Sequence, residues 1–204
     1  MQRNPMFDIS YGLYVLTAND GAKDNGCIIN TATQVTSSPN QITIAVNKDN
    51  YTHDIIDDTK KFTLSVISEA ADFELFKHFG FQSGKTVDKF RSFAHVKRTE
   101  NGLLAITAGT NSYISGTVTQ KLDVGSHTIF LATVTETGIL SDAASATYTY
   151  YHSRIKPKPD TVTKGKTVWR CKICGYVYEG EELPPDFVCP LCKHGASDFE
   201  KVTG

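Results

Sequence analysis

The sequence predicts a mainly β protein that is followed by a small metal-binding domain. Residues 1–152 are rich in Thr, Val, Ile and Ser, and they fall into β-branched and aromatic segments separated by turn residues. Four of the five cysteines then lie in two close pairs near the C-terminal end. Between these parts stands a stretch rich in proline and lysine, which favours neither a strand nor a helix.

The change in composition gives the expected domain boundaries. A chain of 204 residues is long enough for one or two domains. We predict a large domain over residues 1–153, a linker over residues 154–166 and a small domain over residues 167–204.

Charge and hydropathy exclude several classes of partner. The formal net charge is −1, so no excess of positive charge favours nucleic acid or an acidic membrane surface. No apolar run approaches the roughly 18 residues of a membrane-spanning helix. Residues 1–5 also lack the apolar stretch of a signal peptide. We therefore expect a cytoplasmic protein with neither a nucleic-acid nor a membrane partner.

Seven segments of the large domain are predicted strands, because each is rich in β-branched or aromatic residues and is bounded by turn residues. They cover residues 11–18, 26–31, 41–46, 62–67, 112–122, 128–135 and 146–151. Seven strands with two short helices suggest a closed or nearly closed barrel. Cys27 lies within the second strand and is expected to be a buried small residue.

Two helices are expected between these strands. Thr52 or Asp54 can cap the first helix. The second is predicted over residues 71–79, where phenylalanines recur on one face, and Gly80 is the expected stop.

The cysteine pairs have the spacing of a tetrahedral metal site. Cys171 and Cys174 are separated by two residues, as are Cys189 and Cys192. Two such turns facing each other build a cage of four sulfurs, and in a reducing cytosol this pattern indicates a metal rather than disulfides. Four thiolates suit zinc and iron alike, so the spacing alone leaves the metal open.

Aromatic residues around the cysteines narrow the choice, because a structural zinc ribbon needs few of them. They are Trp169, Tyr176, Tyr178, Phe187 and Phe199. With these residues, the segments 169–178, 186–190 and 197–200 resemble rubredoxin. The resemblance implies one iron ion held by four thiolates, which carries one electron at a time.

Two features depart from free-standing rubredoxins. The segment between the cysteine pairs is shorter, as in rubredoxin modules fused to other enzymes. Lys193 also stands where glycine is usual, and glycine accepts a positive φ without penalty. Gly195 is a candidate to take over that role. A structural zinc knuckle remains the alternative to an iron site.

Two polar stretches of the large domain offer donors for a phosphate-bearing cofactor. Residues 30–39 carry many hydroxyls after a strand, and residues 47–53 lead into a helix whose dipole favours an anion. Threonine-rich stretches are also common in ordinary strands and caps. No Gly-x-Gly-x-x-Gly motif opens a helix, which argues against a Rossmann site.

The order of several segments resembles the flavin reductase family over residues 6–152. They are residues 11–17, 30–39, 62–66, 88–90 and 125–130. The resemblance implies a split β-barrel, tightly bound FMN, and a homodimer with its sites near the subunit interface.

By this resemblance, a set of residues is expected to contact the flavin. The isoalloxazine and ribityl chain would be wrapped by Asn30, Thr31, Ala32, Thr33, Gln34, Val35 and Ser37. The phosphate would lie near Asn47, Thr52 and His53, with Lys89 neutralising its charge and Phe90 packing on the flavin. His127 is the candidate catalytic residue near flavin and nicotinamide, although Ser126 replaces the aspartate that usually precedes it.

The two domains in this order resemble the high-molecular-weight rubredoxins of anaerobes. The resemblance implies that NADH gives a hydride to FMN, that the iron then takes single electrons, and that a flavodiiron protein is the acceptor. One alternative is a flavoredoxin-like carrier, reduced by another protein rather than by NAD(P)H. Another is a non-redox binding module with a zinc knuckle. No residue is placed to select NADH over NADPH.

Overall fold

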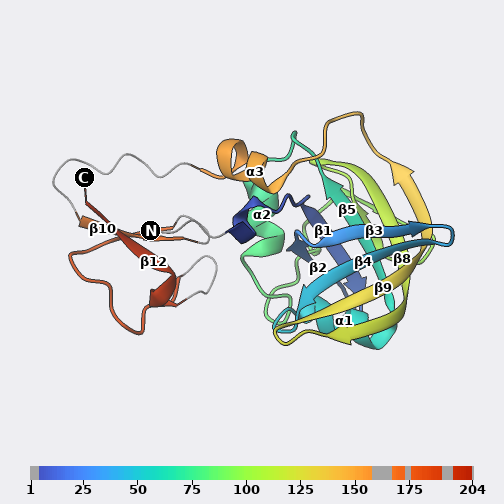
Figure 1. The fold of residues 1–204 in the computed structure, drawn as a ribbon, viewed down its shortest axis with the longest axis horizontal. Coiled ribbons are helices and arrows are strands. Elements are labelled where there is room, and N and C mark those ends of the chain that lie inside the picture. The colour runs from blue at the N-terminus through green and yellow to red at the C-terminus, as the bar shows by residue number, and fades with distance from the viewer. Residues whose placement is uncertain (1–4, 158–166, 173–175, 190–194, 204) are drawn as a thin grey trace.

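The protein is described by a computed structural model, which covers residues 5–157, 167–172, 176–189 and 195–203. Its larger part is a seven-stranded antiparallel sheet that curls into a barrel, with the strand order β2-β1-β5-β8-β9-β4-β3 (Figure 1). A separate three-stranded sheet forms the C-terminal part. The predicted mainly β architecture with a small second domain is therefore confirmed.

The barrel leaves two strand edges unpaired within its sheet, at β2 and β3. Its strands are β1 (Tyr14–Asn19), β2 (Asp24–Ile29), β3 (Ala32–Ser37), β4 (Asn40–Asn47), β5 (Lys61–Ile67), β8 (Thr110–Asp123) and β9 (His127–Ile139). A short hairpin of β6 (Val96–Arg98) and β7 (Leu104–Ile106) lies apart from this sheet. The helices are α1 (Tyr51–Thr59), α2 (Phe73–Gly80) and α3 (Tyr148–Tyr150).

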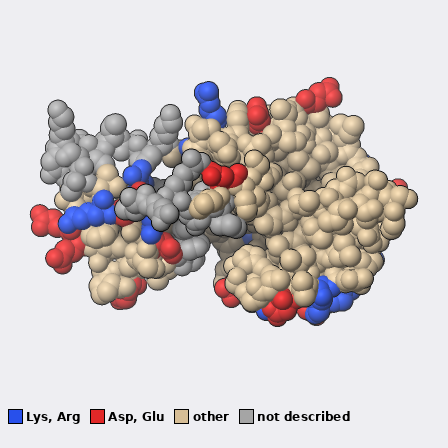
Figure 2. All heavy atoms as spheres, in the orientation of Figure 1, with Lys and Arg blue, Asp and Glu red and all other residues tan. Residues whose placement is uncertain are grey.

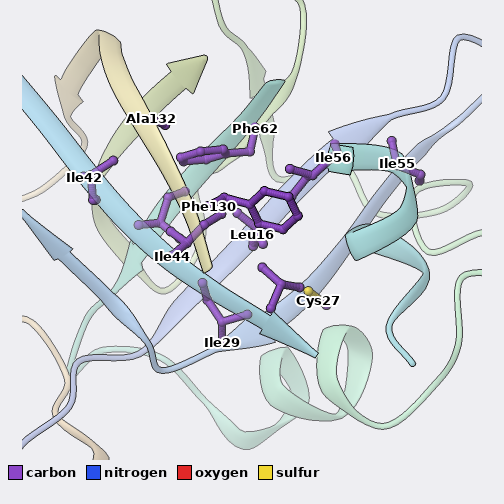
Figure 3. Close-up of a cluster of buried hydrophobic side chains, with 13 residues drawn as sticks. Leu16, Cys27, Ile29, Ile42, Ile44, Ile55, Ile56, Phe62, Phe130 and Ala132 are labelled. Atoms are coloured by element: carbon purple, nitrogen blue, oxygen red, sulfur yellow. The ribbon is translucent and has the colours of Figure 1, made fainter. Parts of the chain in front are cut away.

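The barrel interior is filled by side chains that alternate along the strands. On β4, Ile42, Ile44 and Val46 are buried at every second position, as the period of a strand requires. They meet Phe62 and Phe130, which are fully buried (Figure 3). Cys27 lies in the same cluster, so its predicted burial is confirmed. This interior fixes which residues of β4 and β9 face outward.

The cap of α1 differs from the prediction. Asn50, rather than Thr52 or Asp54, is the N-cap, and its side-chain oxygen accepts a hydrogen bond from the Thr52 amide at 3.2 Å. Asparagine is among the best residues at this position because it satisfies an amide with no partner within the helix. For α2, Asp72 is the N-cap and the helix ends at Gly80, where a stop was predicted.

The predicted strand over residues 146–151 is wrong, because this segment is mainly helical. Thr147 caps α3 by accepting a hydrogen bond from the Tyr150 amide, and a π-helical turn follows over Tyr151–Ile155. The buried Tyr151 ring packs 4.4 Å from the Phe76 ring of α2. Packing against α2 here outweighs the high strand propensity of these aromatic residues, and the segment is helical.

The predicted linker is described only in part. The π-helical turn Tyr151–Ile155 extends into its first residues, whereas residues 158–166 lie outside the described residues. The small domain then pairs three strands in the order β11-β10-β12, which are β10 (Thr167–Cys171), β11 (Val177–Glu179) and β12 (Phe199–Thr203).

The distribution of charged side chains on the surface agrees with the near-neutral net charge. Acidic and basic side chains are interspersed on the visible face, and none of them gathers there into a broad basic patch (Figure 2). Within the described ranges, no helix is both long and apolar enough to cross a membrane.

Candidate metal and flavin sites

One cysteine from each pair lies in the same buried cluster. Cys171 ends β10, Cys189 follows Val188, and both are almost completely buried beside Phe199. The strand pairing places Cys171 opposite Phe199 on β12, which brings the first half of the motif against the C-terminal strand. The other two predicted ligands, Cys174 and Cys192, lie outside the described residues.

Backbone hydrogen bonds set the direction of the chain after Cys171. Its amide donates to the Tyr176 carbonyl at 2.8 Å, and the Lys172 amide donates to the Asp198 carbonyl at 2.8 Å. The first bond joins two described residues on either side of the first cysteine pair's remaining positions, 173–175, which lie outside the described residues.

The predicted aromatic residues surround the two cysteines. The rings of Phe187 and Phe199 meet edge to face at 5.3 Å, and Tyr178 lies 4.8 Å from Phe187. Trp169 and Tyr176 pack on the same cluster. Such a shell excludes water from the sulfurs, which is one of the features that tune an iron–thiolate centre.

Gly195 does not take the role suggested for it after Cys192. Its φ is −78° and its ψ is 177°, so it is extended rather than left-handed. Gly195 instead forms an isolated antiparallel bridge with Val188, next to Cys189. Lys193 lies outside the described residues.

The described donors fit a shared thiolate site for a metal. The two cysteines that can be placed come from different halves of the motif, yet they share one enclosed apolar cluster. In the described part of the chain, no group of three or more Cys, His, Asp and Glu side chains is assembled for a metal. The four-cysteine motif is therefore the candidate metal centre.

Several predicted flavin-site residues meet at one end of β4 and β9. Asn47 and His127 are direct partners in the strand register. His53, in the first turn of α1, places its Nε2 atom 2.8 Å from the Thr128 hydroxyl. The His53 ring also lies 5.5 Å from the ring of Phe130, which belongs to the barrel core. The structure therefore brings Asn47, His53 and His127 together from three separate elements.

A cavity opens beside the start of β3. It has a volume of about 230 Å³ and is lined by Asn30, Thr31, Ala32 and Thr33, among other residues. The Thr31 hydroxyl donates to the Ala45 carbonyl at 2.7 Å, and the Ala45 amide donates to the Thr31 carbonyl at 3.0 Å. These bonds tie the cavity wall to β4 close to its C-terminal end, where Asn47 lies.

The remaining residues of the predicted flavin stretch form an edge strand. Residues 32–37 were expected to wrap a cofactor, and they are β3, paired with β4 on one side only. Gln34, Val35 and Ser37 are exposed along this strand, beyond the cavity. These three residues are not part of this cavity's lining, and their contact with a flavin stays a prediction; an edge strand with an exposed valine favours contact with another surface.

Thr52 lies inside the fold rather than at its surface. Its hydroxyl accepts a hydrogen bond from the Asn25 side chain at 2.9 Å, and both residues are buried. This pair links α1 to β2 under the N-terminus of the helix. A direct contact between the Thr52 hydroxyl and a phosphate would have to share this oxygen with the Asn25 amide.

Lys89 is also buried, with 3% of its surface exposed. Its ammonium group donates to the carbonyl oxygens of Gly26 and Phe79, at 2.7 and 2.9 Å. Burial lowers the pKa of Lys89 to about 8. Phe90 packs at the edge of the neighbouring core, with its ring 5.5 Å from that of Phe79.

His127 is half-buried at the start of β9. Its Nδ1 atom lies 2.9 Å from the Ser126 hydroxyl, the residue that replaces the expected aspartate. A serine can donate to or accept from the imidazole, so Ser126 fixes the ring without supplying a negative charge. The neighbouring Lys48 amide donates to the Ser126 carbonyl at 3.0 Å, which holds this turn against the end of β4.

Some residues of the candidate site were not foreseen. Tyr11 and Gly12 line the cavity with Thr43 and Ala45. Sequence reasoning lacked the pairing of β3 with β4, which places Thr43 opposite Thr33 and Ala45 beside Thr31. Asn50 was missed as the cap of α1, although asparagine before a helix is a usable signal.

Comparison with known proteins agrees with both domains. Residues 6–158 match the family described as "Flavin reductase like domain", and residues 169–200 match "Rubrerythrin, rubredoxin-like domain". The chain is 32% identical to "High molecular weight rubredoxin" of Moorella thermoacetica, over 99% of this chain and all of that protein. It is 34% identical to "Ferric-chelate reductase (NAD(P)H)" of Archaeoglobus fulgidus, over 80% of this chain and 96% of that protein.

A solved structure shows the same barrel. The NADH:FAD oxidoreductase of Streptomyces globisporus in complex with NAD and FAD fragments has a TM-score of 0.64 and 22% identity. The match covers 80% of this chain and 99% of that one. On these grounds the chain belongs to the flavin reductase-like family, and it joins a flavin-binding reductase domain to a C-terminal rubredoxin-like iron-binding domain in the manner of the high molecular weight rubredoxins.

Proposed function

We propose that this protein passes electrons from a reduced nicotinamide nucleotide to FMN in the barrel, then to one iron ion in the small domain, and on to a partner protein. The observation that carries the proposal is the burial of Cys171 and Cys189 in one aromatic cluster, on the same chain as a flavin reductase-like barrel. FMN accepts a hydride as two electrons and yields them singly to a one-electron centre.

The barrel residues hold and orient the reactants in this proposal. Asn30, Thr31 and Thr33 line the cavity beside β3 and can hydrogen-bond the polar edge of a ring. The N-terminus of α1, beside Asn47 and His53, offers a positive dipole to a phosphate. His127 borders the same end of β4 and can orient the nicotinamide. No acid–base residue is required, because hydride transfer depends on holding two rings against each other.

The size of the cavity supports a homodimer. Ligand pockets usually span about 300–1,000 Å³, and the cavity beside β3 has about 230 Å³. A second subunit against the exposed edge of β3 would complete the walls. In this proposal Gln34, Val35 and Ser37 face both the cofactor and the partner subunit.

The acceptor is proposed to be a flavodiiron protein in the cytoplasm. The chain is 29% identical to "Putative diflavin flavoprotein A 5" of Nostoc sp., over 59% of this chain and 21% of that protein. A related segment therefore occurs within that longer protein. A small domain that carries an enclosed one-electron centre is suited to brief docking, since redox encounters use small interfaces.

An anaerobic titration tests the proposal. FMN, iron and zinc are first quantified per chain in the purified protein, and NADH or NADPH is then added while the flavin and ferric-thiolate absorbances are followed. We expect stoichiometric FMN and iron, with loss of flavin absorbance before loss of the ferric-thiolate absorbance. Zinc with no flavin would overturn the proposal. Reduction by reduced ferredoxin but by neither nucleotide would instead identify a flavoredoxin-like carrier.

A further inference from the structure

Phe81 is a hydrophobic residue of the barrel domain that packs against the cysteine cluster. The cluster of Cys171, Cys189 and Phe199 is otherwise surrounded by residues of its own domain, and Phe81 joins that shell from the C-terminal end of α2. We propose that Phe81 docks the rubredoxin-like domain on the barrel, so that electrons pass from flavin to iron within one chain at the end of α2.

The backbone around Phe81 is held firmly by its own domain. Phe81 is the C-cap of α2, and its amide donates to the Lys77 carbonyl at 3.2 Å. The preceding turn buries Phe76 and Phe79 in the core beneath α2. Gly80 lies so close to β2 that an added Cβ atom would meet Ile28 at 3.3 Å. A residue at this position projects from a rigid base rather than from a loose loop.

The Phe81 side chain contacts both domains. On its own side, its ring meets the Phe73 ring edge to face at 5.8 Å. On the other side, it packs on the cluster that contains two of the four metal-ligating cysteines. The side chain is half-buried between these two contacts. An aromatic group held in this way supplies a large contact at a low cost in rotamer entropy.

The same helix end also reaches the predicted flavin site. The Phe79 ring lies 5.5 Å from the ring of Phe90, which the family resemblance predicts to pack on the flavin. Phe79 and Phe81 stand two positions apart at the end of α2. The end of α2 is therefore next to Phe90 on one side and to the cysteine cluster on the other. In this proposal electrons leave the flavin by this end of α2, within one chain.

The contact suits a redox docking site. Electron-transfer encounters use small interfaces that form and separate quickly, and a tether keeps the two surfaces at a high effective concentration. Each transfer takes one electron from reduced FMN and converts one ferric ion to ferrous iron. Two transfers return the flavin to its oxidised form and release its proton to solvent. The nicotinamide nucleotide supplies the electron pair, so this inference rests on the proposed function.

Charge placed at Phe81 should separate the domains without disturbing the barrel. We expect Phe81→Asp to increase the radius of gyration of the intact, cofactor-loaded protein in small-angle X-ray scattering. Flavin reduction should keep its wild-type rate, whereas the following loss of ferric-thiolate absorbance should slow by about tenfold or more. Phe81→Tyr keeps the ring and should behave as wild type in both measurements. In the wild type, iron reduction should be first order and independent of protein concentration.

A matched control separates docking from a general effect of an added charge. Ile139 is 83% exposed at the end of β9, and Ile139→Asp should change neither the scattering nor the iron reduction rate. The docking inference is overturned if Phe81→Asp leaves both measurements unchanged, or if Ile139→Asp slows iron reduction equally. If neither nucleotide reduces the wild-type flavin, the proposed function fails instead. The scattering comparison, and iron reduction started from photoreduced flavin, then still decide the docking site.

Discussion

The ammonium group of Lys89 donates a hydrogen bond of 2.7 Å to the carbonyl oxygen of Gly26, inside the protein. A second bond reaches the Phe79 carbonyl at 2.9 Å, so one side chain ties β2 to the end of α2. Lys89 was predicted to neutralise a phosphate, and that role stays a prediction. The bonds observed here indicate a structural role, because both acceptors are backbone groups of the barrel domain.

The low pKa of Lys89 predicts an increase in stability at alkaline pH. Its pKa is about 8 in the folded protein, because burial disfavours the charged form, against 10.5 for an ordinary lysine. Between these values the unfolded chain holds a proton that the folded chain has released, so the free energy of unfolding rises with pH. The free energy of unfolding gains about 3 kcal/mol in full once the pH exceeds both pKa values. Well below pH 8 the lysine is charged in both states, and none of this gain is present.

Urea denaturation at several pH values between 7 and 10.5 measures this effect. The free energy of unfolding should rise with pH in the wild type. This rise should be absent in Lys89→Met, which has no titratable group at this position. Lys85→Met is the matched control, since the Lys85 side chain is 55% exposed and should leave the rise intact. Parallel curves for wild type and Lys89→Met would show that Lys89 holds its proton throughout.

The sequence predicted the elements whose local pattern and packing agree. The strand that carries Ile42, Ile44 and Val46 alternates cleanly, because its inward side chains fill the barrel. The cysteine spacing likewise predicted a shared site, and the burial of Cys171 beside Cys189 follows it. For the cysteines this holds for Cys171 and Cys189, because Cys174 and Cys192 lie outside the described residues and their ligand role stays a prediction.

Other features depend on contacts that no local pattern carries. Residues 146–151 have strand-like composition, yet Tyr151 packs on Phe76 of α2 and the segment is mainly helical. Thr52 was expected at a phosphate, but Asn25 from a different strand binds its hydroxyl in the interior. The start of a helix is polar whether it caps, binds an anion or completes a buried network. Only the tertiary fold distinguishes these roles.

Removal of the Thr52 hydroxyl tests whether this residue is structural. In Thr52→Val the buried Asn25 amide loses its acceptor, which typically costs about 1–3 kcal/mol of folding free energy. We expect this loss in chemical denaturation both with and without FMN, because the bond lies within the protein. Thr59→Val, at the other end of α1, removes a hydroxyl from a less buried position and should cost less. A loss seen only with FMN present would instead support the predicted phosphate contact.

A bulky side chain in the cavity beside β3 tests the flavin site. Ala32 lines that cavity, and Ala32→Phe fills space that a flavin ring would need. We expect FMN to bind at least about tenfold more weakly, with the iron content unchanged. Equilibrium titration followed by flavin fluorescence measures the affinity. Thr137→Phe, which adds the same ring at an exposed position on β9, should bind FMN normally. Unchanged FMN affinity in Ala32→Phe would place the flavin elsewhere.

Substitution of one cysteine should separate the two cofactors. Cys189 is completely buried in the metal-domain cluster, whereas Cys27 is buried in the barrel core. Cys189→Ser should lose the ferric-thiolate absorbance and keep FMN, because the barrel does not use this thiol. Cys27→Ser should keep the iron. The two variants make the same chemical change at two buried sites, so a difference in iron content reports ligation rather than burial.

The tryptophan supplies a second readout for the same pair of variants. The chain has one tryptophan, Trp169, and its side chain packs on the cysteine cluster. Metal binding to four thiolates contributes directly to the folding free energy of a small domain, so loss of the metal should loosen this cluster. We therefore expect a red shift of Trp169 emission in Cys189→Ser and none in Cys27→Ser. A red shift of equal size in both would mean that the emission follows barrel stability. Wild-type emission in Cys189→Ser would mean that the aromatic shell, rather than the metal, holds the small domain together.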